Sequence, residues 1–106
     1  MNARAWLVLL AAALMEVGGD AVVRRGLRGS SLLVVLAGCA TLGGYGLVVN
    51  TIKWDFSRLF GVYVCFFALV SVLFGRFVFN EVVPRSTWLG LALIIGGGAL
   101  IQFGRR

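Results

Sequence analysis

The chain has 106 residues, of which 60% are hydrophobic and 13% are charged, and its mean hydropathy is +0.99. These values lie outside the range of ordinary water-soluble domains and predict one integral membrane domain over residues 1–106. The net charge of +6 would suggest nucleic-acid binding in a soluble protein, but here the Lys and Arg residues lie between apolar runs and at the ends, as membrane-interface anchors do.

Four apolar segments follow one another along the chain, each near the roughly 20 residues that a helix needs to cross a bilayer core. They cover residues 5–23, 31–50, 59–79 and 87–103. Their connectors are short, so neighbouring helices must be antiparallel. Strands are excluded because no segment alternates as a membrane barrel strand would. The expected fold is an all-α membrane protein with four transmembrane helices per subunit.

The first segment contains a carboxylate, Glu16, which costs roughly 2.5 to 3.5 kcal/mol to insert and therefore marks a candidate functional site. The membrane interior favours the protonated form of a carboxylate, and the chain has no histidine to carry a proton near neutral pH. We therefore expect a proton and a cationic substrate to compete for Glu16. The alternative is a structural acid that is hydrogen-bonded to a neighbouring helix.

Asp20 follows Glu16 by one helical turn on the same face, and Arg24 follows one turn later. Asp20 could be a second cation ligand, or it could pair with Arg24. The start of the segment, Arg4 followed by the apolar run 5–15, resembles a signal peptide. Glu16 interrupts that run before a convincing cleavage site, so we expect an uncleaved, multi-pass protein.

Two tyrosines, Tyr45 in the second segment and Tyr63 in the third, lie deep in apolar sequence. An aromatic wall beside a carboxylate would suit an organic cation through cation–π contact, and ordinary packing is the alternative. The cysteines, Cys39 and Cys65, lack the CxxC spacing of a metal or redox site and are expected to be small packing residues. We expect no metal, no cofactor and no enzymatic machinery.

The fourth segment reads GLALIIGGGALI, with Gly90 and Gly97 on one helical face. Small residues let membrane helices approach closely. Four thin helices make a poor cavity, and a transport pathway normally lies between two repeats or bundles, so transport would require a second copy. We therefore favour a homodimer contact at this face over packing within one chain. The expected contact residues are Gly90, Leu93, Ile94 and Gly97.

The Lys and Arg residues divide equally between the two sides of the membrane. One side carries Arg4, Lys53, Arg58, Arg105 and Arg106, and the other carries Arg24, Arg25, Arg28, Arg76 and Arg85. Without a bias, the positive-inside rule selects neither orientation. A chain that inserts both ways could form an antiparallel dimer, which we favour over a parallel dimer of fixed orientation.

Three features together resemble the small multidrug resistance family of the drug/metabolite transporter superfamily: the motif LMEVGG around Glu16, the four short spans, and the run FNEVVPRSTWLGLALIIGGGALI. The stretch GVYVCFF, residues 61–67, resembles instead the YnfA-type small inner-membrane proteins. The first resemblance implies a dimer, often antiparallel, that exchanges protons for hydrophobic or guanidinium-type cations at the first-helix glutamate. Tyr63 would then supply an aromatic contact. The segment DFSRLFGVYV departs from the multidrug pattern, because it lacks the usual proline and tryptophan, and leaves the substrate open.

The expected protein is therefore a proton-coupled antiporter of a bacterial-type inner membrane that exports small or hydrophobic organic cations. Its partners would be a second copy of itself, the lipid bilayer, protons and cations, with no nucleic acid. The alternative is a non-transporting or heteromeric member of the same superfamily that acts as an assembly partner.

Overall fold

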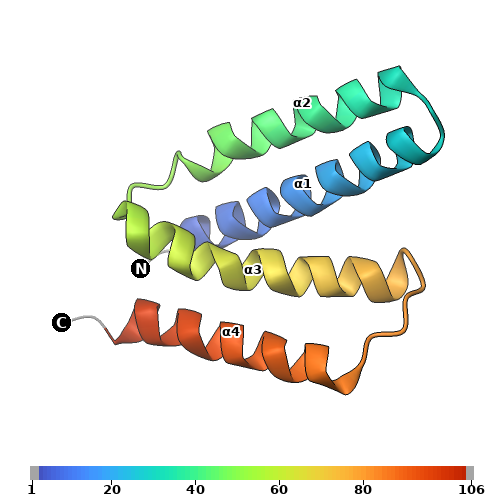
Figure 1. Cartoon of the computed structure of the whole chain (residues 1–106). Helices are drawn as coiled ribbons and strands as arrows, with labels where there is room; N and C mark the ends of the chain where they lie inside the picture. Colours follow the sequence, from blue (N-terminus) through green and yellow to red (C-terminus); the bar gives the residue numbers. More distant parts are fainter. Residues whose placement is uncertain (1–2, 105–106) are drawn as a thin grey trace. The chain divides into compact units, whose positions relative to one another are not determined.

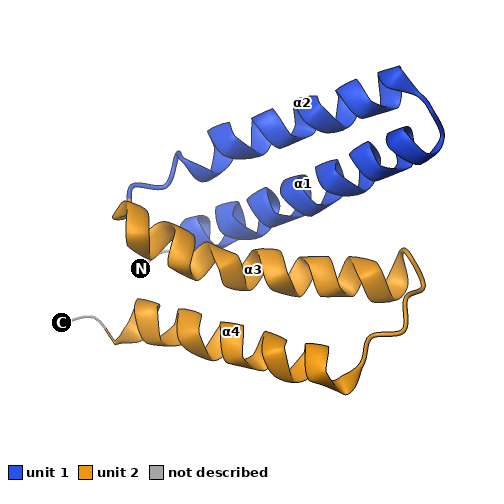
Figure 2. Cartoon of the chain, viewed as in Figure 1, with its two compact units in different colours: residues 1–53 blue, residues 54–106 orange. Residues whose placement is uncertain are grey.

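The computed structural model describes residues 3–104, which form four helices in two compact units that divide between residues 53 and 54 (Figures 1 and 2). Unit 1 precedes this division and unit 2 follows it. In unit 1, α1 (Ala3–Arg28) packs antiparallel to α2 (Leu32–Val49). In unit 2, α3 (Phe56–Phe77) packs antiparallel to α4 (Arg85–Phe103). All four helices are long and apolar enough to span a membrane. The prediction of an all-α membrane protein with four spans is confirmed.

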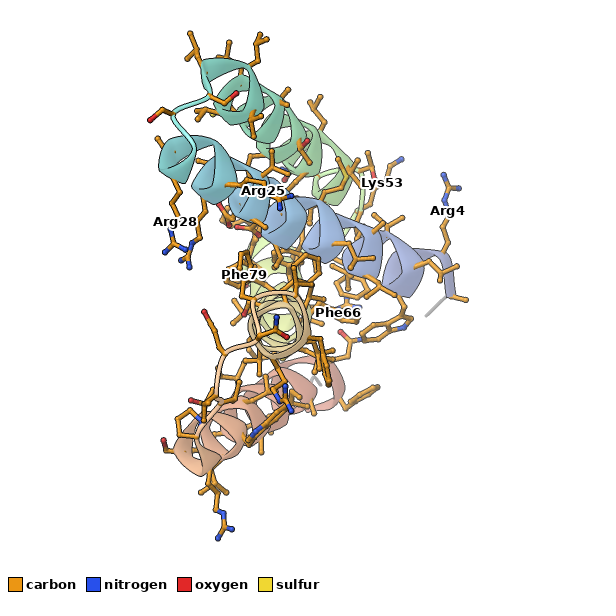
Figure 3. All side chains as sticks on the ribbon, turned by 90° about the vertical axis from the view of Figure 1, so that its right-hand side faces the viewer. Arg4, Arg25, Arg28, Lys53, Phe66 and Phe79 are labelled. Atoms are coloured by element: carbon orange, nitrogen blue, oxygen red, sulfur yellow. The ribbon has the colours of Figure 1, made fainter. Side chains whose placement is uncertain are left out.

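The first helix is longer than the apolar segment that predicts it. It continues past Val23 through the arginines that were expected in a connector, and ends at Arg28. Arg25 and Arg28 occupy its last turn, where the helix dipole favours positive charge. Arg4 lies at the opposite end of the same helix (Figure 3). The other helices overlap the expected spans 31–50, 59–79 and 87–103 with ends that differ by a few residues. The expected C-terminal anchors, Arg105 and Arg106, lie outside the described residues.

A tight turn joins α1 to α2. Ser30 has a left-handed backbone, with φ of 57°, and the amide of Ser31 donates to the carbonyl of Gly26 at 2.9 Å. The Ser31 hydroxyl then accepts from the amide of Val34 at 3.4 Å and caps the start of α2. The turn fixes the two helices side by side.

A longer connector joins α3 to α4. The amides of Val78 and Phe79 both donate to the carbonyl of Phe74, and Asn80 has a left-handed φ of 56°. This reversal lets the amide of Glu81 donate to the carbonyl of Gly75 at 2.9 Å, which holds Glu81 beside the last turn of α3. Pro84 is the N-cap residue of α4. This position agrees with its place between the predicted spans, because proline would break the interior of a helix.

Glycines set the close approach of the two helices in unit 1. A Cβ atom added at Gly38 would lie 2.5 Å from Cγ2 of Val23, 2.8 Å from its amide nitrogen and 2.9 Å from the carbonyl oxygen of Gly19. A Cβ atom at Gly19 would lie 3.0 Å from the side chain of Leu42. The α1–α2 contact therefore depends on the absence of side chains at these positions.

In unit 2, a glycine likewise allows the two helices to pack closely, and the atom that occupies the space beside it is a cysteine sulfur. Gly98 of α4 leaves room for the thiol of Cys65, which donates to the carbonyl of Ile94 at 3.3 Å. Gly61 of α3 accommodates the side chain of Ile101. Cys65 therefore lies in the helix contact, as expected for a small packing residue.

The outside of both units is apolar. Large side chains are widely exposed on every helix, with exposed fractions of 80% at Leu33 of α2 and 79% at Leu93 of α4. Such a surface is unfavourable in water and favourable in lipid.

Candidate functional site

Glu16 lies half-buried on α1, beside the surface that contacts α2. That surface includes the α1 residues Met15, Gly19, Val23 and Gly26. Because successive helical residues are rotated by about 100°, Glu16 and Asp20, which follow Met15 and Gly19, lie on the adjoining strip. The structure therefore places both predicted acids on one side of one helix.

Asp20 is more exposed than Glu16 and lines a shallow depression of about 520 Å³ at the arginine-rich end of α1. Arg24 and Arg28 line the same depression, together with the aliphatic side chains of Val23 and Leu27. This location fits either expected role of Asp20, as a second cation ligand or as the partner of Arg24.

The two candidate aromatic residues belong to different units. Tyr45 is half-buried on α2, in the same unit as Glu16 and Asp20, whereas Tyr63 is buried on α3 in unit 2. Tyr63 meets Phe60 edge-on at a centroid distance of 6.3 Å and Phe67 at 6.5 Å. These contacts make Tyr63 part of an aromatic row along α3. Its role as a substrate contact stays a prediction.

Most of the α4 face that we expect to form the dimer contact is not used for packing within unit 2. The exception is Ile94, whose backbone carbonyl accepts the hydrogen bond from the thiol of Cys65. Apart from the adjacent residues and backbone of α4 itself, no described atom of unit 2 lies within 4 Å of a Cβ atom built at Gly90 or Gly97. Leu93 is 79% exposed and Ile94 is 40% exposed. The helix turns Leu91, Gly98 and Gln102 inward instead.

A polar cluster in unit 2 was missed by sequence reasoning. Gln102 is 5% exposed, and its side-chain oxygen accepts a hydrogen bond from Nε of Arg58 at 3.0 Å. The guanidinium group of Arg58 also lies 4.0 Å from the centroid of the Trp54 ring. The sequence signal was an isolated glutamine in an apolar segment, which needs a partner when it is buried.

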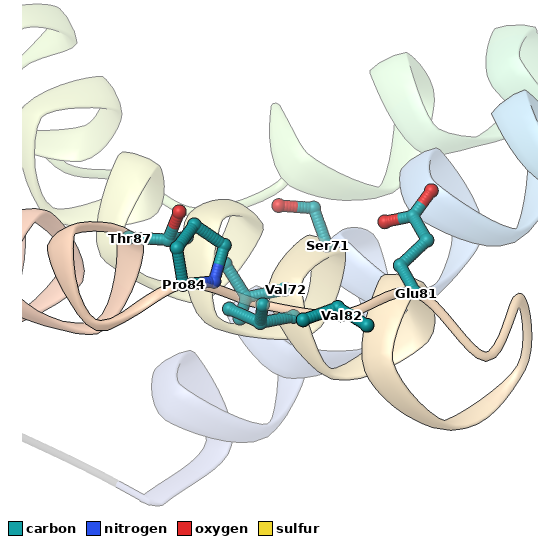
Figure 4. A pocket seen from close by; sticks show the side chains of 7 residues that line it. Ser71, Val72, Glu81, Val82, Pro84 and Thr87 are labelled. Atoms are coloured by element: carbon teal, nitrogen blue, oxygen red, sulfur yellow. The ribbon is translucent and has the colours of Figure 1, made fainter.

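A second feature that the sequence did not reveal is a pocket of about 200 Å³ in unit 2, between the end of α3, the connector and the start of α4 (Figure 4). Its polar lining consists of Ser71, Glu81 and Thr87. In the sequence, Glu81 lies between the third and fourth predicted spans, and the pocket depends on the chain reversal at Asn80. Within residues 3–104, no three His, Cys, Asp or Glu side chains gather in a way that could hold a metal ion.

Comparison with known proteins gives the family. A family model described as "Uncharacterised BCR, YnfA/UPF0060 family" matches residues 3–106. The chain belongs to the YnfA/UPF0060 family. A UPF0060 membrane protein of Synechocystis sp. is 32% identical over 107 residues, which cover 100% of this chain and 99% of the relative. UPF0060 membrane proteins of Pseudomonas paraeruginosa and Pseudomonas aeruginosa are each 31% identical over 103 residues, 95% of this chain and 93% of the relative. No solved structure matches the chain significantly.

The family match extends the YnfA-type resemblance, which the sequence shows most clearly in residues 61–67, over all four helices. This chain is therefore a multi-pass membrane protein of the UPF0060 family. The relation to the small multidrug resistance family remains a hypothesis.

Proposed function

We propose that this UPF0060 protein is a proton-coupled antiporter of the small multidrug resistance type, located in a bacterial inner membrane. Two copies form the transporter, and Glu16 binds either a proton or a small or hydrophobic organic cation. The observation that carries this proposal is the half-buried carboxylate of Glu16 in a helix that is long and apolar enough to span the bilayer.

The chemistry of exchange follows from the surroundings of Glu16. A carboxylate in an apolar environment binds a proton to remove its charge, and a nearby cation stabilises the ionised form instead. The two ligands are therefore mutually exclusive at one acid.

The open face of α4 supports the need for a second copy. In lipid, apolar helices gain little by leaving acyl chains for each other, so close packing of small residues drives association. Gly90 and Gly97 offer such packing and are not used by α3. A second α4 at this face would join two chains into one dimer. Balanced Lys and Arg on both sides favour an antiparallel arrangement.

Transport in liposomes tests the proposal. When a proton gradient is imposed, purified protein should move cationic dye or guanidinium in the direction opposite to the proton flow. Glu16→Gln should abolish this transport, because a glutamine side chain cannot bind and release a proton. Asp55→Asn removes one negative charge at an exposed position before α3 and is the matched control. Cation addition to the wild-type protein in weakly buffered detergent should also release protons, whereas Glu16→Gln should release none. A protein that moves no cation, or a Glu16→Gln variant that behaves as wild type, would instead support the non-transporting alternative.

Reporter fusions test the orientation. Fusions at the C-terminus should report both sides of the membrane, and two added C-terminal lysines should shift the population to one side. A single orientation before the change would exclude dual insertion and leave the parallel dimer.

A further inference from the structure

The pocket at the end of unit 2 gathers three oxygen-bearing side chains from three separate segments. Ser71 comes from α3, Glu81 from the connector and Thr87 from the first turn of α4. In Figure 4, their oxygen atoms point to one side, with the carbon atoms of Val72 and Val82 on the other. The pocket thus combines a polar wall with an aliphatic one.

Each of the three polar side chains of this wall can accept a hydrogen bond. The Ser71 hydroxyl donates its proton to the carbonyl of Ala68 at 2.9 Å, so its lone pairs are left to accept. A carboxylate at Glu81 accepts through both oxygens. The hydroxyl oxygen of Thr87 can also accept a hydrogen bond. Arg76, a cation on the last turn of α3, has its guanidinium 5.3 Å from the ring centroid of Phe77.

We propose that this pocket binds a primary ammonium group. An ammonium has three N–H donors, as many as the pocket has polar side chains, and its single positive charge complements the carboxylate of Glu81. A divalent metal ion fits poorly, because Ca²⁺ takes six to eight oxygen ligands and Mg²⁺ requires a near-ideal octahedron. The volume of about 200 Å³ and the aliphatic wall of Val72, Val82 and Pro84 admit a short alkyl chain.

A primary ammonium at this position could belong to a small free amine or to the headgroup of an ethanolamine lipid, because the pocket lies at the end of a membrane-spanning helix. The chemistry of recognition is the same for both sources. The inference concerns binding in unit 2 and stands apart from transport at Glu16.

Titration by NMR of the full-length protein tests the site, with Glu16→Gln as the background so that binding at Glu16 does not contribute. Propylammonium in detergent micelles should shift the amide signals of residues 71–87. Tetramethylammonium, which has no N–H donors, should bind much more weakly. In a second arm, lipid nanodiscs with and without phosphatidylethanolamine should show the same shifts if the lipid is the source.

Two variants test which groups determine the binding of the ammonium. Glu81→Gln should raise the Kd for propylammonium by about tenfold or more, because a charged hydrogen bond is lost at constant shape. Gly75→Ala keeps the charge but places a Cβ atom 2.5 Å from Oε1 of Glu81, so the carboxylate must move and binding should weaken. Asp55→Asn should leave the Kd unchanged.

Three results would overturn the site: no shift from either amine source, shifts that persist in Glu81→Gln, or equal binding of tetramethylammonium. Shifts from the free amine identify a soluble ligand, and shifts from the lipid alone identify the headgroup. Both of these outcomes support the proposal. Failure of transport by the wild-type protein would contradict the antiporter without altering this result.

Discussion

Replacing Gly38 by alanine gives the sharpest test of the α1–α2 contact. The added methyl group would lie 2.8 Å from the amide nitrogen of Val23 and 2.9 Å from the carbonyl oxygen of Gly19. Both are backbone atoms, so no rotamer change removes the clash and the helices must separate. Overpacking of this kind costs about 1–3 kcal/mol. Gly43→Ala on the same helix is the matched control, because a Cβ atom there meets nothing within 4 Å.

Both substitutions gain the same helix propensity, about 0.5–1 kcal/mol for Gly to Ala. That gain cancels when the variants are compared, so Gly38→Ala should be less stable than Gly43→Ala by about 1–3 kcal/mol. Unfolding in mixed micelles at increasing mole fraction of sodium dodecyl sulfate, followed by circular dichroism, measures this difference. Equal stability of the two variants, or a more stable Gly38→Ala, would refute the close approach of α1 and α2.

Three further substitutions test other parts of the chain. Ser30→Gly should raise the unfolding free energy by up to about 1 kcal/mol, because Ser30 has a left-handed backbone that glycine adopts without strain; an unchanged or lower value in the same unfolding assay would contradict the turn. Gln102→Leu should cost about 1.5–3 kcal/mol by leaving Nε of Arg58 without its acceptor, and a stability equal to wild type would show that the pair contributes nothing. Gly97→Leu should reduce the amount of cross-linked dimer in liposomes but preserve the helicity of the monomer, whereas Gly98→Leu should disrupt the α3–α4 contact. Normal dimerisation of Gly97→Leu would show that the dimer interface does not include this face of α4.

The four helices could be predicted because their signals are local. An apolar run of about 20 residues is sufficient to identify each span, and the position of Pro84 marks the start of α4. The extension of α1 to Arg28 was missed, because charged residues were interpreted as a connector. In the structure the arginines continue the helix beyond the apolar run and complement its dipole.

The polar clusters could not be predicted, because they join residues that are distant in sequence. Arg58 and Gln102 are 44 positions apart and meet only when α3 and α4 pair in one particular register. The pocket beside Ser71 likewise depends on the left-handed residue Asn80, which directs Glu81 back toward α3. Sequence identifies Glu81 as an acid at a span end and gives no reason to associate it with a serine on the preceding helix.

The adjacent glycines of α4 show why sequence spacing predicts close packing without identifying the partner. Gly98 accommodates Cys65 within the chain, whereas Gly97, rotated by about 100° on the helix, has no such neighbour in unit 2. A helix that needed one packed face could carry a larger residue at Gly97 and at Gly90 without loss, and would gain helix propensity by doing so. Glycine at both positions is advantageous where another helix comes close. In the dimer that we propose, the second copy would also supply the second Glu16, so one contact surface would account for the small residues of α4 and for the other half of the transport pathway.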